Sequence, residues 1–597
     1  MIILIILGLI QALILPGLIC SYYLKDIRPI DRMIFASTTS LIINYGVVWW
    51  LYILNVYSQT SVLVLMLAEL FILFRLRNLF FKDVVDAYQS ARDFIIRCRD
   101  TKGVSFYFVL FVLFCTYYFY LLKANGFLTV FTHWDAVVSW NRWAVELYDG
   151  TFKGSRGYPL AVPILWSIVY VVADETNLQT FAKYICVYWP FLGGLSLFAS
   201  GRFAPKLKNA LALSSIFYLY LLSKGSHTVD FVFSGLVDPF MAAFGALFVY
   251  LALFISSRSK NQYAGYKTAV TFALLSLAGA ALVKLTGVIL LFDFVCLIGF
   301  LLVYKETLER HRRHLFWLCI AALLLATHWY VITTFYWRDW QLIAQYDSLQ
   351  DPRVWLRPYL HLSLFGQTFG WLFIGLALIG AFTSRRALAL FCFVILPLFI
   401  FCAVTVGYDL RATFIVFAPV SVLAAAGIFY VFNVVAKVCE QISTPFASKP
   451  NSQIYVSVFL VVLASSVIVG GLTHVFSRDK VLSSNTEKRA AANDFGNAGN
   501  KRLLQIFEAE PDARIISCWQ TPFGLPGAKG RFIPSGNCTV TLLEGWLTDP
   551  KIKYWLYRDE GNPSQLLTPE VVGQVLAKQH VPIRAEPLGS GFILYSK

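Results

Sequence analysis

Charged residues are scarce in this chain of 597 residues. Asp, Glu, Lys and Arg make up 14% of the sequence, hydrophobic residues make up 58%, and the mean hydropathy is +0.64. A soluble fold of this size needs far more polar surface. The low charge therefore excludes a soluble protein, and lipid is the expected main solvent.

Patterns that would assign metal or nucleotide chemistry are also missing. The 11 cysteines include no pair at metal-ligand spacing, and His133 and His227, the histidines considered as ligands, are too far apart in sequence to share a helix. Gly524, Gly527 and Gly530 follow a Pro-containing turn, so they predict a loop and not a nucleotide-binding site. We expect neither a metal nor another cofactor.

The sequence does contain many long apolar runs. A spanning helix needs about 20 mostly apolar residues, and the short alternating segments of a membrane barrel are not apparent. The runs predict an α-helical membrane bundle of about 14 spans. The N-terminal run lacks a basic start and a cleavage signature, so it predicts a retained helix. The expected spans are residues 1–20, 32–54, 60–74, 104–123, 179–201, 209–223, 236–256, 267–284, 286–304, 315–334, 365–383, 388–406, 412–434 and 454–473.

Basic residues gather in the loops between these runs. The 50 Lys and Arg exceed the 34 Asp and Glu by 16, which in a soluble protein would suggest nucleic acid. In a membrane protein such clusters mark cytoplasmic loops, and the span list can place all of them on one side. Both termini then face outward, and no nucleic-acid partner is expected. The clusters lie at residues 75–102, 202–208, 258–260, 310–313 and 385–386.

Residues 158–173 would break this arrangement if they crossed the membrane. Pro159, Pro163 and Trp166 suit a short helix lying at headgroup depth, so we expect an interfacial helix there.

The composition becomes polar near Arg478, which predicts a small C-terminal α/β domain over residues 478–597. We expect strands at 513–519, 551–557 and 591–595 and helices at 487–507 and 569–579. Cys518 and Cys538, the two cysteines of this segment, could form a disulfide in an oxidising compartment. The expected division of the chain is N-terminal helices and a cytoplasmic loop (1–103), a transmembrane module (104–435), a last span (436–477) and this domain.

Polar groups beside long apolar runs fall on the outward side in four places. The first loop carries an acid and several aromatic residues, the second ends on Asp238, Lys284 occupies a hairpin tip, and Arg411 lies in a short cap. The loop from 336 to 367 adds more cations near Arg411. The first loop contributes Trp134, Asp135, Trp140, Trp143 and Tyr158, and the added cations are Arg338, Arg353, Arg357 and His361.

In order and sidedness these features resemble the GT-C glycosyltransferases, particularly the protein O-mannosyltransferase and aminoarabinose transferase group. The resemblance covers residues 104–435 and matches an acidic first loop, a Tyr-Pro segment, an outward Asp, a Lys-Gly hairpin tip and an Arg before a Pro-containing helix. The sequence departs from the family where Ala136 follows the acid and Ala412 follows the arginine. The matching residues are Asp135, Tyr158-Pro159, Asp238, Lys284 to Gly287, and Arg411 with Pro419.

The resemblance implies transfer of a sugar from a polyprenyl phosphate to a lipid, glycan or protein acceptor, on the outer face of a bacterial inner membrane. Asp135 is the expected base for the acceptor hydroxyl, with Asp238 as a second carboxylate. Lys284 and Arg411 would stabilise the departing phosphate, with Arg338, Arg353, Arg357 and His361 in reserve. Trp134, Trp140, Trp143 and Tyr158 offer flat faces to sugar or lipid. One direct attack implies inversion at the anomeric carbon.

Each residue also has a purely structural interpretation. Asp135 and Asp238 can cap helices, Lys284 can anchor a hairpin by snorkelling, and tryptophans line membrane interfaces. A transporter or flippase of lipid-linked sugars is an alternative function, for which Asp293 inside an apolar run is the relevant acid. A polymerase or ligase of surface glycans and a non-enzymatic scaffold are further alternatives.

Overall fold

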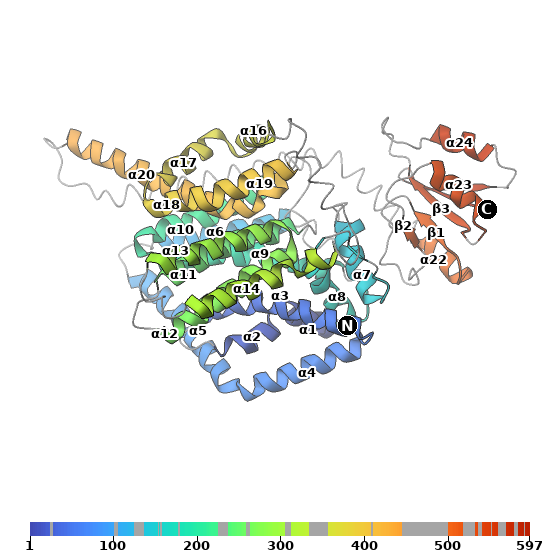
Figure 1. Ribbon diagram of the computed structural model, residues 1–597, viewed down its shortest axis with the longest axis horizontal. Coiled ribbons are helices and arrows are strands. Elements are labelled where there is room, and N and C mark those ends of the chain that lie inside the picture. The colour runs from blue at the N-terminus through green and yellow to red at the C-terminus, as the bar shows by residue number, and fades with distance from the viewer. Residues whose placement is uncertain are drawn as a thin grey trace.

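The computed structural model describes most of the helical bundle and most of the C-terminal sheet (Figure 1). Trp134, Asp135, Arg338, Arg353, Cys518, Cys538 and the predicted span 454–473 lie outside the described residues, as does the side chain of Arg411. The described residues are 1–23, 28–100, 106–124, 136–152, 154–155, 158–176, 179–224, 237–257, 263–304, 312–333, 356–406, 410–443, 500–517, 532–534, 540–550, 552–558, 569–577, 583–589 and 592–597.

Five helices form the N-terminal part of the bundle. They are α1 (Ile2–Leu13), α2 (Leu15–Ser21), α3 (Pro29–Ile53), α4 (Gln59–Arg75) and α5 (Arg77–Asp100). The predicted single span 1–20 is in fact broken at Ile14, where α1 and α2 meet at 46°. Pro16 occupies an early position of α2, where a proline needs no amide hydrogen for the helix ladder.

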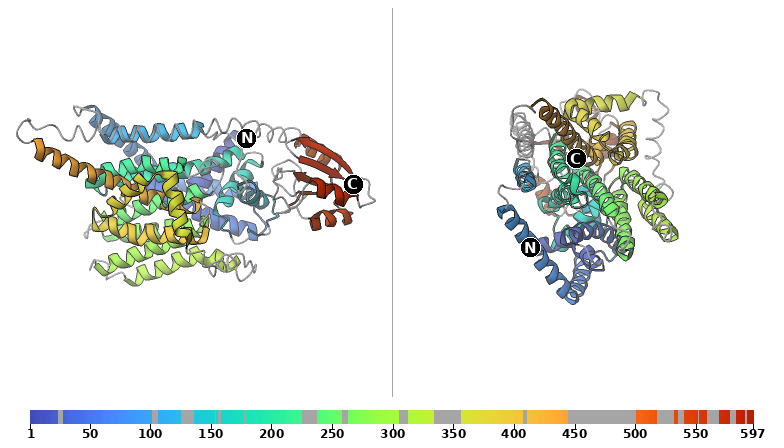
Figure 2. Two further views of the ribbon diagram at one scale, coloured as in Figure 1. Left: turned by 90° about the horizontal axis from the view of Figure 1, so that it is seen from above. Right: turned by 90° about the vertical axis from the view of Figure 1, so that its left-hand side faces the viewer.

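The remaining helices run side by side and are seen nearly end-on in one view (Figure 2). Most follow the predicted spans closely because a long apolar run is a local signal. They are α6 (Phe106–Ala124), η1 (Ala136–Asn141), α7 (Arg142–Tyr148), α8 (Ala161–Ala173), α9 (Gln179–Ser200), η2 (Pro205–Leu207), α10 (Lys208–Lys224), α11 (Asp238–Ser257), α12 (Tyr263–Val283), α13 (Thr286–Tyr304), α14 (Arg312–Val331), α16 (Arg357–Phe369), α17 (Trp371–Ala381), α18 (Arg385–Leu390), η7 (Phe391–Ile395), α19 (Leu396–Val406), η8 (Leu410–Val416) and α20 (Phe417–Ser443).

Within the described residues, five helices are long and apolar enough to cross a membrane, or up to seven if each of two bent pairs is one span. Several shorter apolar helices accompany them, so the total of about 14 stays a prediction. The second bent pair is α16 and α17, which meet at 109° around Gly370. Gly370 has a φ of 92°, which a residue without a side chain adopts most readily. Arg357 and His361, predicted in a loop, therefore lie on helix α16.

Helix α8 differs from its predicted setting. The helix is short, as expected, but every side chain from Ala161 to Val172 is buried. A helix lying on the bilayer surface would expose one polar face to water and one apolar face to lipid. Protein instead surrounds α8, because α1, α3, α7 and α9 pack against it.

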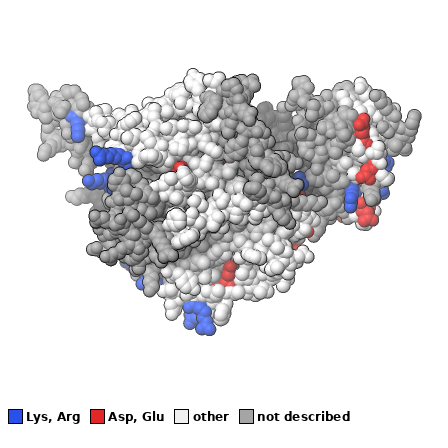
Figure 3. Space-filling view, in the orientation of Figure 1, with Lys and Arg blue, Asp and Glu red and all other residues white. Residues whose placement is uncertain are grey.

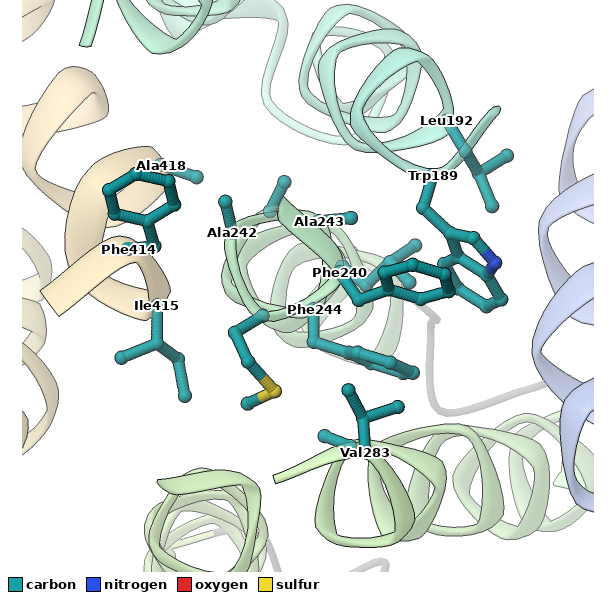
Figure 4. Packing of buried hydrophobic residues seen from close by; sticks show 14 of the residues in the cluster. Trp189, Leu192, Phe240, Ala242, Ala243, Phe244, Val283, Phe414, Ile415 and Ala418 are labelled. Carbon is teal, nitrogen blue, oxygen red and sulfur yellow. The ribbon is translucent and has the colours of Figure 1, made fainter. Parts of the chain in front are cut away.

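The core of the bundle joins α9, α11, α12 and the segment formed by η8 and α20 (Figure 4). Trp189 stacks on Phe244 with ring centroids 5.2 Å apart, and Phe414 and Ile415 approach α11 from the other side. Gly245 allows this approach, because a Cβ there would collide with the carbonyl oxygen of Ile415. Small residues at such contacts are typical of helix packing in membranes.

Charge is unevenly distributed over the bundle. On the face drawn in Figure 3 the described bundle surface is mostly uncharged, and Lys and Arg gather toward the end away from the C-terminal sheet. Helices α10 and α18, whose first residues are Lys208 and Arg385, lie toward that same end in Figure 1. Helix α7 lies toward the opposite end. This asymmetry agrees with basic loops on one side of a membrane.

The C-terminal part is a separate unit with a five-stranded sheet of order β2-β1-β3-β5-β4. β1 pairs in parallel with β2 and β3, and β5 is antiparallel to β3 and β4. Leu503 and Trp546, from two of its helices, lie in the cores on the sheet. α22, β1, β3, β5 and α24 fall within or overlap the predicted elements, whereas β2, α23 and β4 were not predicted. The elements are α22 (Asn500–Ala509), β1 (Ile515–Ser517), β2 (Phe532–Pro534), α23 (Val540–Thr548), β3 (Tyr554–Arg558), α24 (Pro569–Ala577), β4 (Arg584–Gly589) and β5 (Phe592–Ser596).

Candidate functional site

Asp238 and Lys284 form an ion pair at one end of the bundle. The Lys284 Nζ donates to Asp238 Oδ1 at 2.6 Å, although the two residues are 46 positions apart. Asp238 opens α11, where the helix dipole favours a negative charge. Lys284 lies in the turn between α12 and α13, where Gly287 donates its N–H to the Lys284 carbonyl at 2.9 Å. The two residues were predicted from separate loops, and the fold brings them into direct contact.

The two side chains of the ion pair differ in their exposure to solvent. The Asp238 side chain is 4% exposed and the Lys284 side chain is 25% exposed. A buried carboxylate is unfavourable without a cation beside it, so Lys284 compensates Asp238. The lysine reaches the bundle surface as well, where it can meet an anionic group. The turn is tight, because a Cβ on Gly287 would collide with the backbone of Ala280.

The ends of α16, α19 and η8 lie at the same end as this pair. Cys402 on α19 is close enough to Lys284 for an electrostatic interaction. Two residues further, the carbonyl of Val404 accepts a hydrogen bond from Arg357 Nη1 at 3.0 Å. η8, whose first turn contains Arg411, packs on both α11 and α19. Three of the predicted cationic positions therefore lie on elements that meet here.

His361 does not join them as a surface cation. Its side chain is fully buried, and its ring lies 5.4 Å from the ring of Phe399. The ring is therefore not accessible from the surface of the bundle as described. His361 was predicted in an outward loop, but it lies on α16, which packs it against α19. Its role as a reserve cation stays a prediction.

Trp140, Trp143 and Tyr158 form an aromatic cluster. The ring centroids are 5.1 Å apart for Trp140 and Trp143, 5.6 Å for Trp140 and Tyr158, and 6.0 Å for Trp143 and Tyr158. The two tryptophans are nearly buried, whereas Tyr158 is 42% exposed. Three of the four residues predicted to stack on sugar or lipid thus lie together, and the Tyr158 ring is partly exposed.

A chain of contacts links the loop after α7 to the Lys284 turn. The ring of Phe152 lies 6.1 Å from that of Trp49, which lies 5.4 Å from Trp329. The next residue, Tyr330, donates its hydroxyl to the carbonyl of Ala281 at 3.1 Å. Trp49 and Trp329 were not predicted as part of this region. A tryptophan near the outward end of the span 32–54 was the available signal.

No group of three His, Cys, Asp or Glu side chains that could hold a metal ion occurs among the residues described. Asp135, the expected base, lies just before η1 and outside those residues. Among the described residues, the charged side chains at this end of the bundle include the Asp238–Lys284 pair, Arg357 and the Arg142–Glu146 pair on α7 beside the aromatic cluster.

The fold has counterparts among solved structures. ArnT from Cupriavidus metallidurans bound to undecaprenyl phosphate superposes with a TM-score of 0.51 at 12% identity, and the match covers 81% of this chain and 97% of that one. The apo state of the same protein matches with a TM-score of 0.50 at 14% identity and the same coverage. No family model and no curated protein matches the sequence.

These matches concern the fold. ArnT is an aminoarabinose transferase of the GT-C class, so the resemblance to that group predicted from the sequence is confirmed at the level of the fold. The matched share of the chain is larger than residues 104–435 alone, which means that the structural likeness extends beyond the predicted module.

Proposed function

We propose that this protein is a GT-C glycosyltransferase that moves a sugar from a polyprenyl-phosphate donor to a lipid, glycan or protein acceptor. The observation that carries the proposal is the Asp238–Lys284 ion pair at one end of a bundle with the ArnT fold. ArnT itself was crystallised with undecaprenyl phosphate, the kind of lipid that would carry the sugar here.

The cations of the site would act on the leaving group. When the sugar leaves, the bond between its anomeric carbon and the phosphate oxygen breaks, and negative charge collects on the lipid phosphate. A fixed ammonium or guanidinium stabilises that charge most where water is scarce. Lys284 is partly exposed beside Asp238, Arg357 lies on α16, and Arg411 lies at the start of η8. We assign phosphate binding to these three, with Arg338 and Arg353 as further candidates.

A carboxylate would act on the acceptor. The acceptor oxygen forms a new bond to the anomeric carbon as its proton passes to a base, and a single attack from the opposite face inverts that carbon. We assign the base to Asp135, which directly precedes η1. Asp238 is itself held by Lys284, so we assign it the role of orienting the lysine.

The aromatic cluster would hold apolar faces of the donor. Tyr158 exposes 42% of its surface next to two tryptophans that pack edge-on to one another. Aromatic faces bind the apolar side of a sugar ring or a prenyl chain through their large contact area. We propose that the reaction takes place on the extracytoplasmic face of a bacterial inner membrane, on the side of the C-terminal domain.

The test is transfer by the purified full-length protein in liposomes that contain a polyprenyl-phosphate sugar and a candidate acceptor. Asp135→Asn should abolish turnover while folding and lipid binding persist. Asp174→Asn is a matched control, because Asp174 accepts a hydrogen bond from Tyr148 near the same loop but is assigned no role. Retained turnover in Asp135→Asn would overturn the assignment. Comparing surface glycans with and without the gene by mass spectrometry would identify sugar and acceptor.

One observation favours a transporter or flippase of lipid-linked glycans as a second candidate. Asp293 lies within α13, and its Oδ2 atom is buried with no hydrogen-bond partner. Acids inside membrane spans often belong to transport pathways. Movement of a labelled lipid-linked sugar across liposomes, lost in Asp293→Asn and retained in Asp135→Asn, would favour this candidate over the transferase.

A further inference from the structure

Three polar side chains meet inside the N-terminal helices. Gln11 on α1, Asn44 on α3 and Glu69 on α4 are 1%, 2% and 8% exposed. Glu69 lies ten residues after the start of α4 at Gln59 and six before its end at Arg75. At 1.5 Å per residue these separations are about 15 Å and about 9 Å. Asn44, the partner of Gln11, lies near the middle of α3, which is long and apolar enough to cross a membrane, so the cluster lies away from both ends of that helix. An ionisable side chain at such a depth is costly and is commonly functional.

The cluster adjoins the break between α1 and α2. Asn44 Nδ2 donates to the carbonyls of Gln11 and Ala12 at 2.7 and 3.3 Å. These carbonyls belong to the last turn of α1, which has lost its regular partners at Ile14. Broken helices deep in a membrane often form binding sites, because their free carbonyls and nearby side chains can take a ligand.

The amide hydrogens of the cluster are fully used. Gln11 Nε2 donates to Asn44 Oδ1 at 3.2 Å and to Glu69 Oε1 at 3.4 Å, and Asn44 uses both of its hydrogens on the α1 carbonyls. Two buried acceptors then remain without a partner, Gln11 Oε1 and Glu69 Oε2. Each would lose hydrogen-bond energy in this position if no donor were supplied.

We propose that this cluster is a proton-binding site, in which Glu69 is a neutral carboxylic acid paired with the Gln11 amide. A proton on Glu69 Oε2 makes that atom a donor, and Gln11 Oε1 is its acceptor. Gln11 Nε2 already donates to Glu69 Oε1 at 3.4 Å, so this second bond would close a cyclic acid–amide pair in which both groups are satisfied. One proton therefore gives both unpaired oxygen atoms a hydrogen-bond partner and leaves no net charge in the cluster.

A metal cation fits less well. Calcium takes six to eight oxygen ligands, whereas the cluster has two oxygens that are not already accepting hydrogen bonds. The titratable group that interacts with Glu69 from a neighbouring element is the thiol of Cys20 on α2. Among the described charged side chains of α3, Asp31 pairs with Arg202 and Arg32 donates to the Ser21 carbonyl. α1 and α8, which also pack in this region, carry no charged residue. Arg75 and Arg77, where α4 meets α5, lie over the rings of Phe71 and Phe74. No cation named here therefore pairs with Glu69, and the proton neutralises it.

Infrared difference spectroscopy of the full-length protein in liposomes at neutral pH tests this inference, which is independent of the transfer reaction. The wild-type spectrum minus that of Glu69→Gln should contain the carbonyl band of a protonated carboxyl group, because all other acids cancel. Carboxylate bands in this difference would overturn the proposal.

Glu69→Gln keeps both a donor and an acceptor beside Gln11, so it should fold. Gln11→Leu supplies a second measurement, because it leaves the acid but removes its partner. The protonated band should then shift to higher frequency, and an unshifted band would contradict the pairing. Replacing sodium by choline should leave the spectra unchanged, and a carboxylate band that depends on sodium would assign the site to a cation.

Discussion

Replacing Lys284 by methionine removes the ammonium that faces Asp238 at 2.6 Å. The Asp238 carboxylate, only 4% exposed, then stays buried without its counter-ion. Removing one partner of a buried ion pair costs about 3–5 kcal/mol. Because Lys284 is 25% exposed and water reaches the pair from its side, we expect the lower end of that range, about 3 kcal/mol.

A double-mutant cycle separates the pair from its surroundings. Asp238→Asn and Lys284→Met should each lower the free energy of unfolding, measured for the full-length protein in mixed detergent micelles. The double variant buries no unpaired charge, so it should recover about 2 kcal/mol relative to the sum of the single variants. Additivity within about 0.5 kcal/mol would refute the ion pair.

The same variants distinguish a structural lysine from a phosphate-binding lysine. If Lys284 holds the donor phosphate, the double variant should regain stability and still fail to transfer sugar. Recovery of transfer together with stability would show that Lys284 acts only through the fold. Binding of a polyprenyl phosphate to each variant, measured by calorimetry, gives a readout that does not depend on turnover.

Three further predictions concern packing, donor recognition and the C-terminal domain. Gly245→Ala should destabilise the bundle by about 1–3 kcal/mol, because the new methyl group meets the Ile415 carbonyl, whereas Gly375→Ala, with nothing within 4 Å, should be neutral in the same thermal melt. Tyr158→Leu should raise the KM for the donor about tenfold, which corresponds to about 1.4 kcal/mol, without changing the melting temperature. Trp50→Leu is the control, because Trp50 is also exposed. An equal rise of KM in that variant would indicate that both rings belong to a general membrane belt. Hydrogen bonds from Lys553 and Tyr554 lower the pKa of Glu510, so its contribution is present above the ordinary carboxylate pKa and lost as the pH falls through the lowered value. In Glu510→Gln the stability of β3, measured by hydrogen exchange, should depend less on acid pH. The change should be less than about 1 kcal/mol, because Lys553 is 58% exposed and water screens the pair. An unchanged pH profile would contradict the assignment.

The sequence was sufficient for most helices and for expecting Asp238 and Lys284 at one end of the bundle. A span is recognised from about 20 consecutive residues, and α9, α11 and α13 end within a few residues of their predicted limits. The positions of the basic loops predicted which loops share a side of the membrane, and this prediction placed Asp238 and Lys284 together. The likeness of the fold to ArnT followed from the order of these features.

Their contact could not be read from the sequence. Whether Lys284 bonds to Asp238, 46 positions away, depends on how α11 and α12 pack, and no local pattern encodes that packing. The burial of His361 and the bend at Gly370 likewise arise from α16 folding against α19.

The burial of helix α8 could not be predicted from the sequence either. Its apolar sequence is compatible with lipid on one face or protein on all faces, because both environments exclude water and select the same residue types. Composition along the chain therefore determined that this is a membrane bundle and which segments are apolar. The tertiary structure alone decided which apolar faces meet protein and which polar side chains meet each other, since those contacts join residues that are distant in sequence.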